Sequence, residues 1–532
     1  MSGARLSVDV AIIGSGFGGS LAALVARRLG LSAALLERGT HPRFAIGEST
    51  SPLANLLLEE IARRHGLPRL LPFCKWGSWR RERPEIACGL KRGFSFYAHA
   101  AGRPFAGDRN RDDQLLVAAS PRDDVADTHW YRPDFDFFLV RQARDAGAEY
   151  LDRASLDRVE IGDGGVRLFG DRDGETLEVR ARLAVDASGP RGFLWKTLGL
   201  GERPFEGLPE TSGLYTHFEG VRRLDEMGVL SPGDSPPFPP DDAALHHVFD
   251  SGWIWVLRFG NGITSAGAAV RGPLARALRF DEGAPAWGRL LDGLPAVREQ
   301  FADARPAMPF VHRERLSFRA ARASGPGWTM LPSAAAFVDP LLSTGFPLTL
   351  LGVERLGRAL AEDWGSPRLA PRLARDAERS LAETDAAALL VAGLYATFDD
   401  FPVFAALSKL YFAAASFSEA ARRLGRPEVA GSFLCEDREP FGTRMRQICR
   451  RAIASGERDR EALVDDVHEA IAPLDVAGLA RRDRRNWYPF RGDDLVESAG
   501  KIGATAGEAR ALLARCGLAD SASPPIEIPT SP

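Results

Sequence analysis

A strand, a glycine-rich loop, a helix and a second strand follow one another without interruption in residues 8–37. Val8–Ile13 is an apolar run rich in β-branched residues, and it leads directly into the loop Gly14-Ser15-Gly16-Phe17-Gly18-Gly19. An Ala- and Leu-rich stretch to about Leu29 and a second apolar run, Ser32–Leu36, complete the unit. This order is typical of a nucleotide-binding βαβ unit, so the N-terminus predicts an α/β, Rossmann-like fold.

The glycine loop and the acid at the end of the unit have different roles in binding a dinucleotide. Gly14 permits the tight turn, Gly16 lets a pyrophosphate approach the backbone, and Gly19 lets the helix pack closely on the strand. The helix N-terminus offers amide donors to the phosphates. Glu37, with Arg38 beside it, follows the second strand where a carboxylate can bind a ribose hydroxyl. The alternative, a glycine-rich turn between buried elements, gives little reason for the unit to end in an acid.

Composition narrows the class of protein. A chain of 532 residues predicts two or three packed units, and a net charge of −3 gives no electrostatic argument for binding nucleic acid or an anionic membrane. The sequence has no apolar segment typical of a signal peptide and no uncharged stretch of transmembrane length. Its five cysteines are odd in number and lack metal-ligand spacing. These features predict a cytoplasmic protein with reduced thiols and without a metal site, a transmembrane segment or a nucleic-acid partner.

Lysine is rare in this chain. Only five of the 68 basic residues are lysines, namely Lys75, Lys91, Lys196, Lys409 and Lys501. A compact amine can act as a nucleophile, which a guanidinium does poorly. A retained lysine is therefore a candidate for a chemical role, although chance retention is expected for most of the five.

The pattern of elements predicts three regions. Strand and helix signals of the nucleotide-binding kind occupy 5–85, 130–200 and 325–365, and short strands of a β-sheet substrate domain occupy 86–129 and 201–324. A helical region follows over 366–520 and a disordered tail over 521–532. Two hairpins are expected, one turning at Asp163-Gly164 and one at Gly260-Asn261-Gly262.

Three features of these regions are interpreted without a chemical role. The stretch Glu383–Leu424 is dense in Ala and aromatic residues, which favours core packing of a helical cap over an aromatic binding site. His246-His247 is interpreted as structural or exposed, and Lys91 as a charge at the end of a strand. The Pro-rich segment Ser231–Pro240 is expected to be a loop that can cover the site.

Several later segments resemble those of FAD-dependent enzymes with the aromatic-hydroxylase fold, a nucleotide domain interleaved with a mixed-sheet substrate domain. Arg132-Pro133-Asp134-Phe135-Asp136 is similar to that family's R-x-x-F-D entry to a helix, whose arginine lies against the flavin. Asp186-Ala187-Ser188-Gly189 is similar to the strand-end motif that closes over the FAD pyrophosphate.

Within this fold, four segments resemble the flavin-dependent halogenases, and the phenol and pyrrole type more than the tryptophan type. The first is the G-E-S segment Gly47-Glu48-Ser49-Thr50, which implies flavin contact, and the second is Lys75 in Cys74-Lys75-Trp76-Gly77, 27 residues after Glu48, which resembles the context of the catalytic lysine. The third is Phe337–Gly345, which follows F-x-x-P-x-x-S-x-G with Pro340 at its proline. The fourth is Trp253-Ile254-Trp255, which begins W-x-W-x-I-P. The resemblance implies a halide beside Thr344-Gly345, and it implies that Trp253 and Trp255 separate the substrate from the flavin.

Two departures from the family pattern stand out. Leu257-Arg258 replaces the Ile-Pro that would complete the tryptophan signature. Pro332-Ser333 replaces the Gly-Asp that commonly contacts the ribityl chain, which leaves Ser333 at that position. The resemblance covers roughly residues 5–360, and no functional residue is carried over onto the helical region beyond it.

The resemblance implies a halogenase for an electron-rich aromatic, either a small molecule or one borne on a carrier or protein. Reduced FAD and O₂ would form a flavin hydroperoxide, halide would convert it to hypohalous acid, and Lys75 would hold that acid or form a haloamine. Because no second dinucleotide fingerprint is visible, reduced FAD is expected from a separate flavin reductase. Two alternatives stay open: a flavin monooxygenase that hydroxylates an aromatic, including a protein tryptophan, and a non-catalytic carrier on the same fold.

Overall fold

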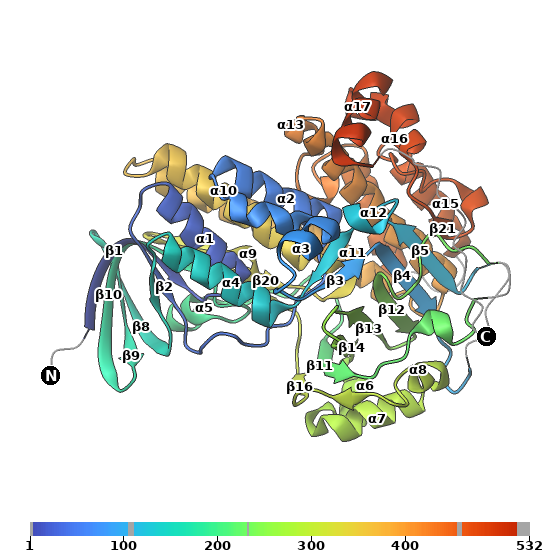
Figure 1. Ribbon diagram of the computed structural model, residues 1–532, viewed down its shortest axis with the longest axis horizontal. Helices are drawn as coiled ribbons and strands as arrows, with labels where there is room; N and C mark the ends of the chain where they lie inside the picture. Colours follow the sequence, from blue (N-terminus) through green and yellow to red (C-terminus); the bar gives the residue numbers. More distant parts are fainter. Residues whose placement is uncertain (1–3, 105–110, 231–233, 455–459, 519–532) are drawn as a thin grey trace.

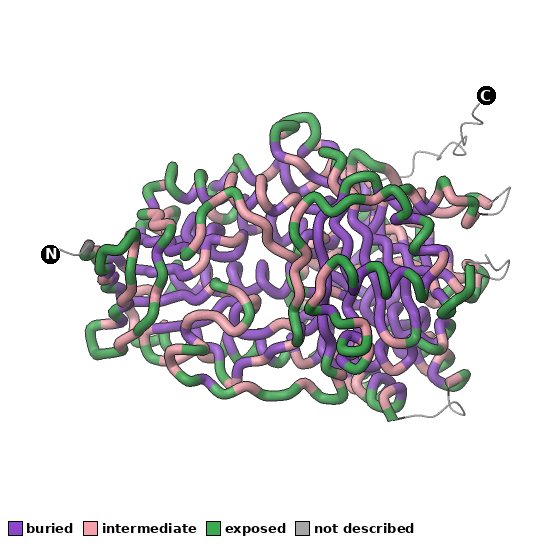
Figure 2. The backbone as a smooth tube through the Cα atoms, turned by 90° about the horizontal axis from the view of Figure 1, so that it is seen from below, coloured by how far each residue is buried: buried purple, intermediate pink, exposed green. Residues whose placement is uncertain are grey.

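A computed structural model describes residues 4–104, 111–230, 234–454 and 460–518 (Figure 1). The predicted tail 521–532 and residues 231–233 of the predicted loop Ser231–Pro240 lie outside the described residues. Two large sheets lie side by side, and most of the helices cover them on one side (Figure 1). The buried stretches run through the interior, while the exposed ones follow the outer loops and helix faces (Figure 2).

The first sheet grows from the N-terminal βαβ unit. Its strands run in the order β18-β19-β10-β1-β2-β7, and β8 and β9 extend it as a hairpin on β10. β1 pairs in parallel with both β2 and β10, as the predicted nucleotide fold requires. The bounds are β1 Ala4–Ile13, β2 Ala33–Leu36, β7 Glu149–Leu151, β8 Ala154–Gly162, β9 Gly165–Arg172, β10 Glu175–Asp186, β18 Ser324–Gly325 and β19 Trp328–Met330.

The second sheet is the larger one and is mainly antiparallel. Its order is β15-β11-β14-β13-β12-β4-β5-β21, with β16 also paired to β11. The bounds are β4 Gly93–Ala98, β5 Gln114–Ala118, β11 Thr211–Glu219, β12 Ala244–Phe249, β13 Gly252–Arg258, β14 Thr264–Arg271, β15 Arg305–Pro306, β16 Val311–Arg313 and β21 Trp487–Tyr488. Two small ribbons join β3 Cys88–Lys91 to β6 Asp127–Trp130, and β17 Phe318–Arg319 to β20 Ala336–Phe337.

Both predicted hairpins are confirmed. β8 and β9 are antiparallel partners around the turn at Asp163-Gly164, and β13 and β14 are partners around Gly260-Asn261-Gly262. The Asn-Gly step suits the tight connection because Gly262 adopts a positive φ of 84°.

Helices pack on both sheets. Those that follow the nucleotide-binding pattern are α1 Phe17–Arg28, α2 Pro52–Arg64, α3 Trp76–Glu82, α4 Arg132–Asp145, α5 Phe193–Thr197, α9 Pro332–Ala335 and α10 Gly345–Asp363. Three short helices flank the second sheet, α6 Gly272–Ala277, α7 Ala284–Asp292 and α8 Pro295–Gln300. The helical third comprises α11 Leu369–Tyr395, α12 Phe401–Arg423, α13 Pro427–Ala430, α14 Phe441–Ala454, α15 Arg460–Ile471, α16 Gly492–Ser498 and α17 Ala506–Cys516.

The helical third is more closely tied to the second sheet than its sequence indicates. Its two-residue strand β21 adds to the sheet in parallel with β5, and Trp487 Nε1 donates to Gln114 Oε1 at 3.0 Å. Aromatic residues of α12 pack against β4, with ring centroids of Phe412 and Phe94 5.2 Å apart. α12 is also the one described helix long and apolar enough to cross a membrane, and 83% of that apolar window is buried inside the protein. It is therefore packed as a core helix.

Candidate active site

Two glycines of the first loop lie so close to other backbone atoms that a side chain would not fit. Gly14 has a φ of +98°, and a Cβ placed there would lie 2.6 Å from the carbonyl oxygen of Ala187. A Cβ on Gly19 would lie 1.9 Å from the carbonyl oxygen of Gly14. Gly16 differs, because the first atom its Cβ would meet is an Arg132 nitrogen at 3.5 Å. Gly16 thus leaves room on the side where a pyrophosphate would approach the backbone.

Glu37 is brought to the glycine loop by the pairing of β2 with β1. Its Oε2 accepts from the Ser15 amide at 3.2 Å and the Ser15 hydroxyl at 2.8 Å, and it pairs with Arg43 at 3.0 Å. Its Oε1 accepts from the Gly39 amide at 2.9 Å. Burial raises the pKa of Glu37, but Arg43 and these hydrogen bonds outweigh burial and bring the pKa down to about 2. Arg38, the next residue, is exposed.

Arg132 joins three segments that lie far apart in the sequence. Its guanidinium forms a two-point pair with Asp136, with both distances 2.7 Å, and donates to the Gly47 carbonyl at 2.7 Å. It also lies 5.0 Å from the ring centroid of Phe17. Arg132 therefore holds the G-E-S segment against the glycine loop from the start of α4.

Asp186 lies at the end of β10, beside the end of β1. Both of its oxygens are used within its own turn, by the Ser188 amide at 2.9 Å and the Leu194 amide at 2.7 Å. Burial raises the pKa of this carboxyl. Asp186 therefore shapes the turn whose residues Ala187 and Ser188 face Gly14.

The G-E-S segment combines buried and accessible groups. Gly47 is exposed with a φ of +91°, and Glu48 is buried. Glu48 Oε1 lies 2.7 Å from His217 Nε2, and the Glu48 carbonyl accepts from the Trp130 amide at 2.7 Å.

Buried polar atoms without a protein partner occur beside this segment and the glycine loop. Within the described part of the chain, they include Glu48 Oε2, His41 Nδ1 and Arg43 Nε. Such atoms cost free energy unless a ligand or water satisfies them. Together with the open space at Gly16, they fit a site for a polar, phosphate-bearing cofactor.

Lys91 is the last residue of β3, as the sequence suggested for a charge at the end of a strand, but it is fully buried. Its amine donates to Ser49 Oγ at 2.8 Å and to the Thr50 carbonyl, and it lies 3.7 Å from the ring centroid of Phe94. Burial lowers the pKa of Lys91, and the carboxylate of Asp127 offsets part of this effect. The sequence contained the signal, because Lys91-Arg92-Gly93 is also K-x-G, but only strand pairing places this lysine on the G-E-S segment.

Lys75 lies elsewhere. It precedes α3, is half-buried, and its amine donates to the carbonyl of Cys516 at 2.6 Å. Cys516 ends α17 in the helical third. Lys75 therefore connects two surface helices in this structure, and the carbonyl that its amine contacts is not part of the G-E-S or Phe337–Gly345 segments.

The segment Phe337–Gly345 ends at the start of a long helix. Leu342 and Ser343 have positive φ values of 65° and 55°, so two residues other than glycine are held in the left-handed region. Thr344 is buried, whereas Gly345 is exposed, and a Cβ on Gly345 would meet nothing within 4 Å. The open amides at the N-terminus of α10 can attract an anion.

Three aromatic rings bring this helix start to the other segments. The ring centroid of Phe346 lies 4.7 Å from that of Phe17 and 4.6 Å from that of Trp130. The glycine loop, the end of β6 and the start of α10 therefore meet at one place. Ser333 is half-buried in α9, which follows β19, and Pro340 precedes the turn at Leu342.

Trp253 and Trp255 are both buried on β13. Trp253 Nε1 is 3.2 Å from Asp339 Oδ1 and 3.2 Å from the Tyr395 hydroxyl, and that hydroxyl donates to Asp339 Oδ2 at 2.9 Å. Burial raises the pKa of Asp339 to about 6. Tyr395 belongs to α11, so the helical third contributes a side chain to this segment, which sequence analysis missed because no motif marks it.

The two adjacent histidines are buried, so the expectation of a structural role fits and that of exposure does not. His246 stacks on Phe96 with centroids 4.4 Å apart, and His247 Nδ1 lies 2.9 Å from His99 Nε2. Burial lowers the pKa of His246 to about 3 and that of His247 to about 4. Both rings are therefore neutral near pH 7.

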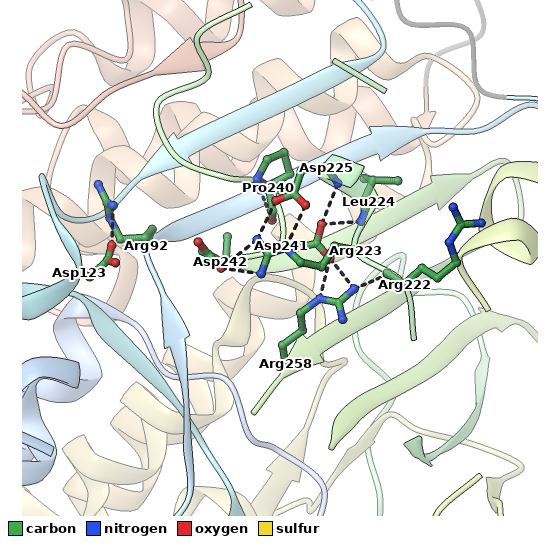
Figure 3. Close-up of polar contacts among 12 residues, drawn as sticks. Arg92, Asp123, Arg222, Arg223, Leu224, Asp225, Pro240, Asp241, Asp242 and Arg258 are labelled. Carbon is green, nitrogen blue, oxygen red and sulfur yellow. Dashed lines mark hydrogen bonds and ion pairs between the residues drawn. The ribbon is translucent and has the colours of Figure 1, made fainter. Parts of the chain in front are cut away.

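Arg258, the departure from the tryptophan signature, has a structural partner. Its Nε donates to Asp241 Oδ1 at 2.7 Å, and a second nitrogen donates to the Val221 carbonyl at 2.8 Å. Asp241 Oδ2 in turn accepts from the amides of Leu224 at 2.6 Å and Asp225 at 3.1 Å (Figure 3). Arg258 thus fastens two loops to the end of β13.

The same cluster reaches the residue that follows Lys91. The amide of Arg92 donates to the Asp242 carbonyl at 2.6 Å, and its guanidinium pairs with Asp123 at 2.7 Å (Figure 3). The loops held by Arg258 therefore also support the end of β3.

Comparisons with known proteins agree with this arrangement. A family model described as tryptophan halogenase matches residues 128–391. The tetracycline 7-halogenase of Kitasatospora aureofaciens is 32% identical over 369 residues, which cover 67% of this chain and 64% of that protein. The monodechloroaminopyrrolnitrin halogenase PrnC of Pseudomonas fluorescens is 28% identical over 419 residues, covering 76% of this chain and 70% of the relative.

Solved structures extend the likeness over most of the chain. The crystal structure of halogenase PltM is 26% identical, has a TM-score of 0.77, and covers 90% of this chain and 99% of its own. The structure of PltM with phloroglucinol and FAD is 24% identical with a TM-score of 0.79, and at that identity it supports the fold. On the matched family model, the curated relatives and the shared fold, this chain belongs to the flavin-dependent halogenase family.

Proposed function

We propose that this protein is an FAD-dependent halogenase that acts on an electron-rich aromatic. The observation that carries the proposal is Lys91, a buried amine hydrogen-bonded to the G-E-S segment. A buried lysine whose amine donates to uncharged oxygens lowers the free energy of unfolding. A chemical role therefore explains the position of Lys91 better than a structural one.

The residues around the glycine loop would hold FAD. Gly14, Gly16 and Gly19 give the backbone its close approach, Glu37 would bind the adenosine ribose after exchanging its present partners, and Arg132 would lie against the flavin. Reduced FAD, with O₂ and halide, supplies hypohalous acid. The chain's own residues have to keep that acid away from water and direct it to the substrate.

The halide would lie at Thr344-Gly345, where exposed backbone and the N-terminus of α10 favour an anion. Trp253 and Trp255 would separate the substrate from the flavin. The Trp253 indole N–H is already bonded to Asp339 and Tyr395, so this residue would act as a fixed wall rather than a donor to substrate.

Lys91 is proposed in the role that the sequence resemblance assigned to Lys75. A buried amine with a lowered pKa is a better nucleophile at neutral pH than a half-buried amine on a backbone carbonyl. Both lysines remain predictions, and they are tested side by side below.

The substrate, partners and location are proposals by analogy with the relatives. Their names include a tetracycline halogenase and a brominase of a carrier-bound pyrrole, so both free and carrier-borne aromatics are reasonable substrates. A separate reductase would supply reduced FAD in the cytoplasm.

We also propose a division of the chain into domains. Residues 5–85, 130–200 and 325–365 form the FAD-binding domain, residues 86–129 and 201–324 form the substrate domain, and residues 366–520 form the helical domain.

Supplying reduced FAD, O₂ and bromide with a panel of phenols, indoles and pyrroles tests the function. A brominated product that is lost in Lys91→Ala and retained in Lys75→Ala is expected, because removing a general acid–base or nucleophilic group costs about 10²–10⁴ in rate. The reverse pattern would restore Lys75 as the catalytic lysine. Oxygen insertion without halide would identify a monooxygenase instead, and a colourless protein that binds no FAD would identify a carrier.

A further inference from the structure

Two buried charged residues face each other behind the G-E-S segment. Lys91 of β3 and Asp127 of β6 are direct partners in the antiparallel ribbon, and they are 0% and 6% exposed. Side chains of directly opposed residues lie on the same face of such a ribbon, with Cβ atoms about 5 Å apart. The amine and the carboxylate are therefore near neighbours in a dry environment.

Each group keeps hydrogen-bonding capacity beyond its bonds to other residues. The Lys91 amine donates to Ser49 Oγ and the Thr50 carbonyl, and Asp127 Oδ1 accepts from Asn55 Nδ2 at 2.8 Å. Among the described residues, Asp127 Oδ2 is buried with no hydrogen-bond partner. A buried carboxylate oxygen without a partner is costly, whereas the same oxygen carrying a proton is not.

A proton can move between these two groups without changing the net charge of the site. Ammonium with carboxylate and amine with carboxylic acid both have zero net charge, so neither arrangement requires an isolated buried ion. Only the second arrangement leaves the lysine nitrogen with a free lone pair.

We propose that Asp127 is the positioning residue that shares a proton with Lys91 and delivers it to the leaving hydroxide when the amine receives halogen. The proposal rests on the proposed function. In the step it supports, the Lys91 nitrogen attacks the halogen of hypohalous acid, the halogen–oxygen bond breaks, and the leaving hydroxide takes the proton from Asp127 as water. This forms a haloammonium and restores the carboxylate. Transfer of halogen to the arene then releases the ring proton back to the Lys91–Asp127 pair. The electrophilic halogen from hypohalous acid is the two-electron oxidant in this step, and the ring carbon that gains the halogen is oxidised.

Other charged and titratable groups surround the pair, but none replaces Asp127. His129 and His246 face Lys91, and burial lowers the pKa of both, so they stay neutral. On α12, burial raises the pKa of Tyr411, and Glu419 is paired with Arg423 at 2.7 Å. Burial itself raises the pKa of Asp127 and lowers that of Lys91, which favours proton sharing.

The scarcity of lysine makes a direct test possible. Lysine labelled with ¹³C at Cε gives five signals from this chain, and Lys91→Arg identifies the one from Lys91. In the wild type, this signal should titrate well below the ordinary range of a lysine amine. In Asp127→Asn, loss of the opposing carboxylate should lower the Lys91 midpoint by about one pH unit or more, and Asp127→Glu should restore it. The control Asp124→Asn, an exposed residue paired with Arg122, should leave the midpoint unchanged.

The rates of bromination and of hypohalous acid formation complete the experiment. Asp127→Asn should reduce bromination of the aromatic by about 10²-fold, while bromide-dependent hypohalous acid, trapped with a small scavenger, forms at the wild-type rate. An unchanged Lys91 midpoint, or a shifted midpoint with an unchanged bromination rate, would overturn the proposal. The titration needs no turnover, so a protein that shows the expected midpoints but brominates nothing would contradict the proposed function and leave the Lys91–Asp127 coupling established.

Discussion

At the scale of single residues, Glu37 shows how hydrogen bonds and a nearby cation can outweigh burial. Its carboxylate accepts from Ser15 and Gly39 and pairs with Arg43. Because the folded protein lowers the pKa from 4.5 to about 2, the charged form is favoured by folding. This stabilisation is fully present above pH 4.5 and disappears as the pH falls towards 2.

Glu37→Gln should therefore lower the free energy of unfolding by about 3 kcal/mol near pH 7. The difference from the wild type should shrink between pH 4.5 and pH 2, because the wild-type carboxylate is then protonated as well. Urea unfolding at several pH values measures this. Glu149→Gln, at an exposed position on the neighbouring strand, is the control and should change the free energy of unfolding little. A difference that stays constant with pH would show that the charge of Glu37 contributes nothing.

Tyr395 is the residue by which the helical third reaches the proposed halide loop. Its hydroxyl donates to Asp339, whose other oxygen accepts from the amide of Leu341 at 2.9 Å. Tyr395→Phe leaves a buried carboxylate oxygen unpaired, at a cost of about 1–3 kcal/mol, and loosens the turn before Thr344.

We expect Tyr395→Phe to raise the KM for bromide by about tenfold with a smaller change in kcat, measured in the bromination assay. Tyr488→Phe, which removes a buried hydroxyl on β21, should leave the KM for bromide unchanged. Equal effects of the two variants on bromide would contradict the role of Tyr395.

At the scale of elements, Arg258 turns a departure from the family signature into a clamp at the end of β13. Its partner Asp241 is buried, and burial raises the pKa of that carboxyl while Arg258 lowers it. The pair joins β13 to the loops before β12 and after β11 (Figure 3).

Arg258→Leu should lower the free energy of unfolding by about 3–5 kcal/mol, because it leaves Asp241 as an unpaired buried charge. Adding Asp241→Asn should recover part of the loss, and a double-mutant cycle measures the coupling. The control Arg222→Leu removes an exposed pair with Glu299 and should cost about 1 kcal/mol or less. Additive effects of Arg258→Leu and Asp241→Asn would argue against the clamp.

At the scale of the whole molecule, the helical third and the second sheet share one core. Phe412 of α12 is buried against Phe94 and Phe96 of β4, and the aromatic-rich stretch is part of the interior as the sequence predicted. The strand β21 adds a second, independent connection to the same sheet.

Phe412→Ala should therefore lower the stability of the whole chain by about 3–5 kcal/mol and keep a single unfolding transition. Calorimetry with intrinsic fluorescence checks both expectations. Ile161→Ala, at an exposed position on the β8–β9 hairpin, should change stability little. Two separate transitions, of which Phe412→Ala shifts only one, would show that the helical third unfolds independently.

The sequence by itself determined the local parts of this protein. The βαβ unit, both hairpins and the G-E-S and Phe337–Gly345 segments are recognisable because turns, strand patterns and glycine loops depend on residues close together in the chain. Only the tertiary structure places two lysines of similar K-x-G context in different surroundings. Pairing of β3 with β6 buries Lys91 opposite Asp127, and the last helix holds Lys75. The tertiary structure also decided which partners Tyr395 and Arg258 have, since burial and hydrogen bonds between distant segments arise only when the chain packs.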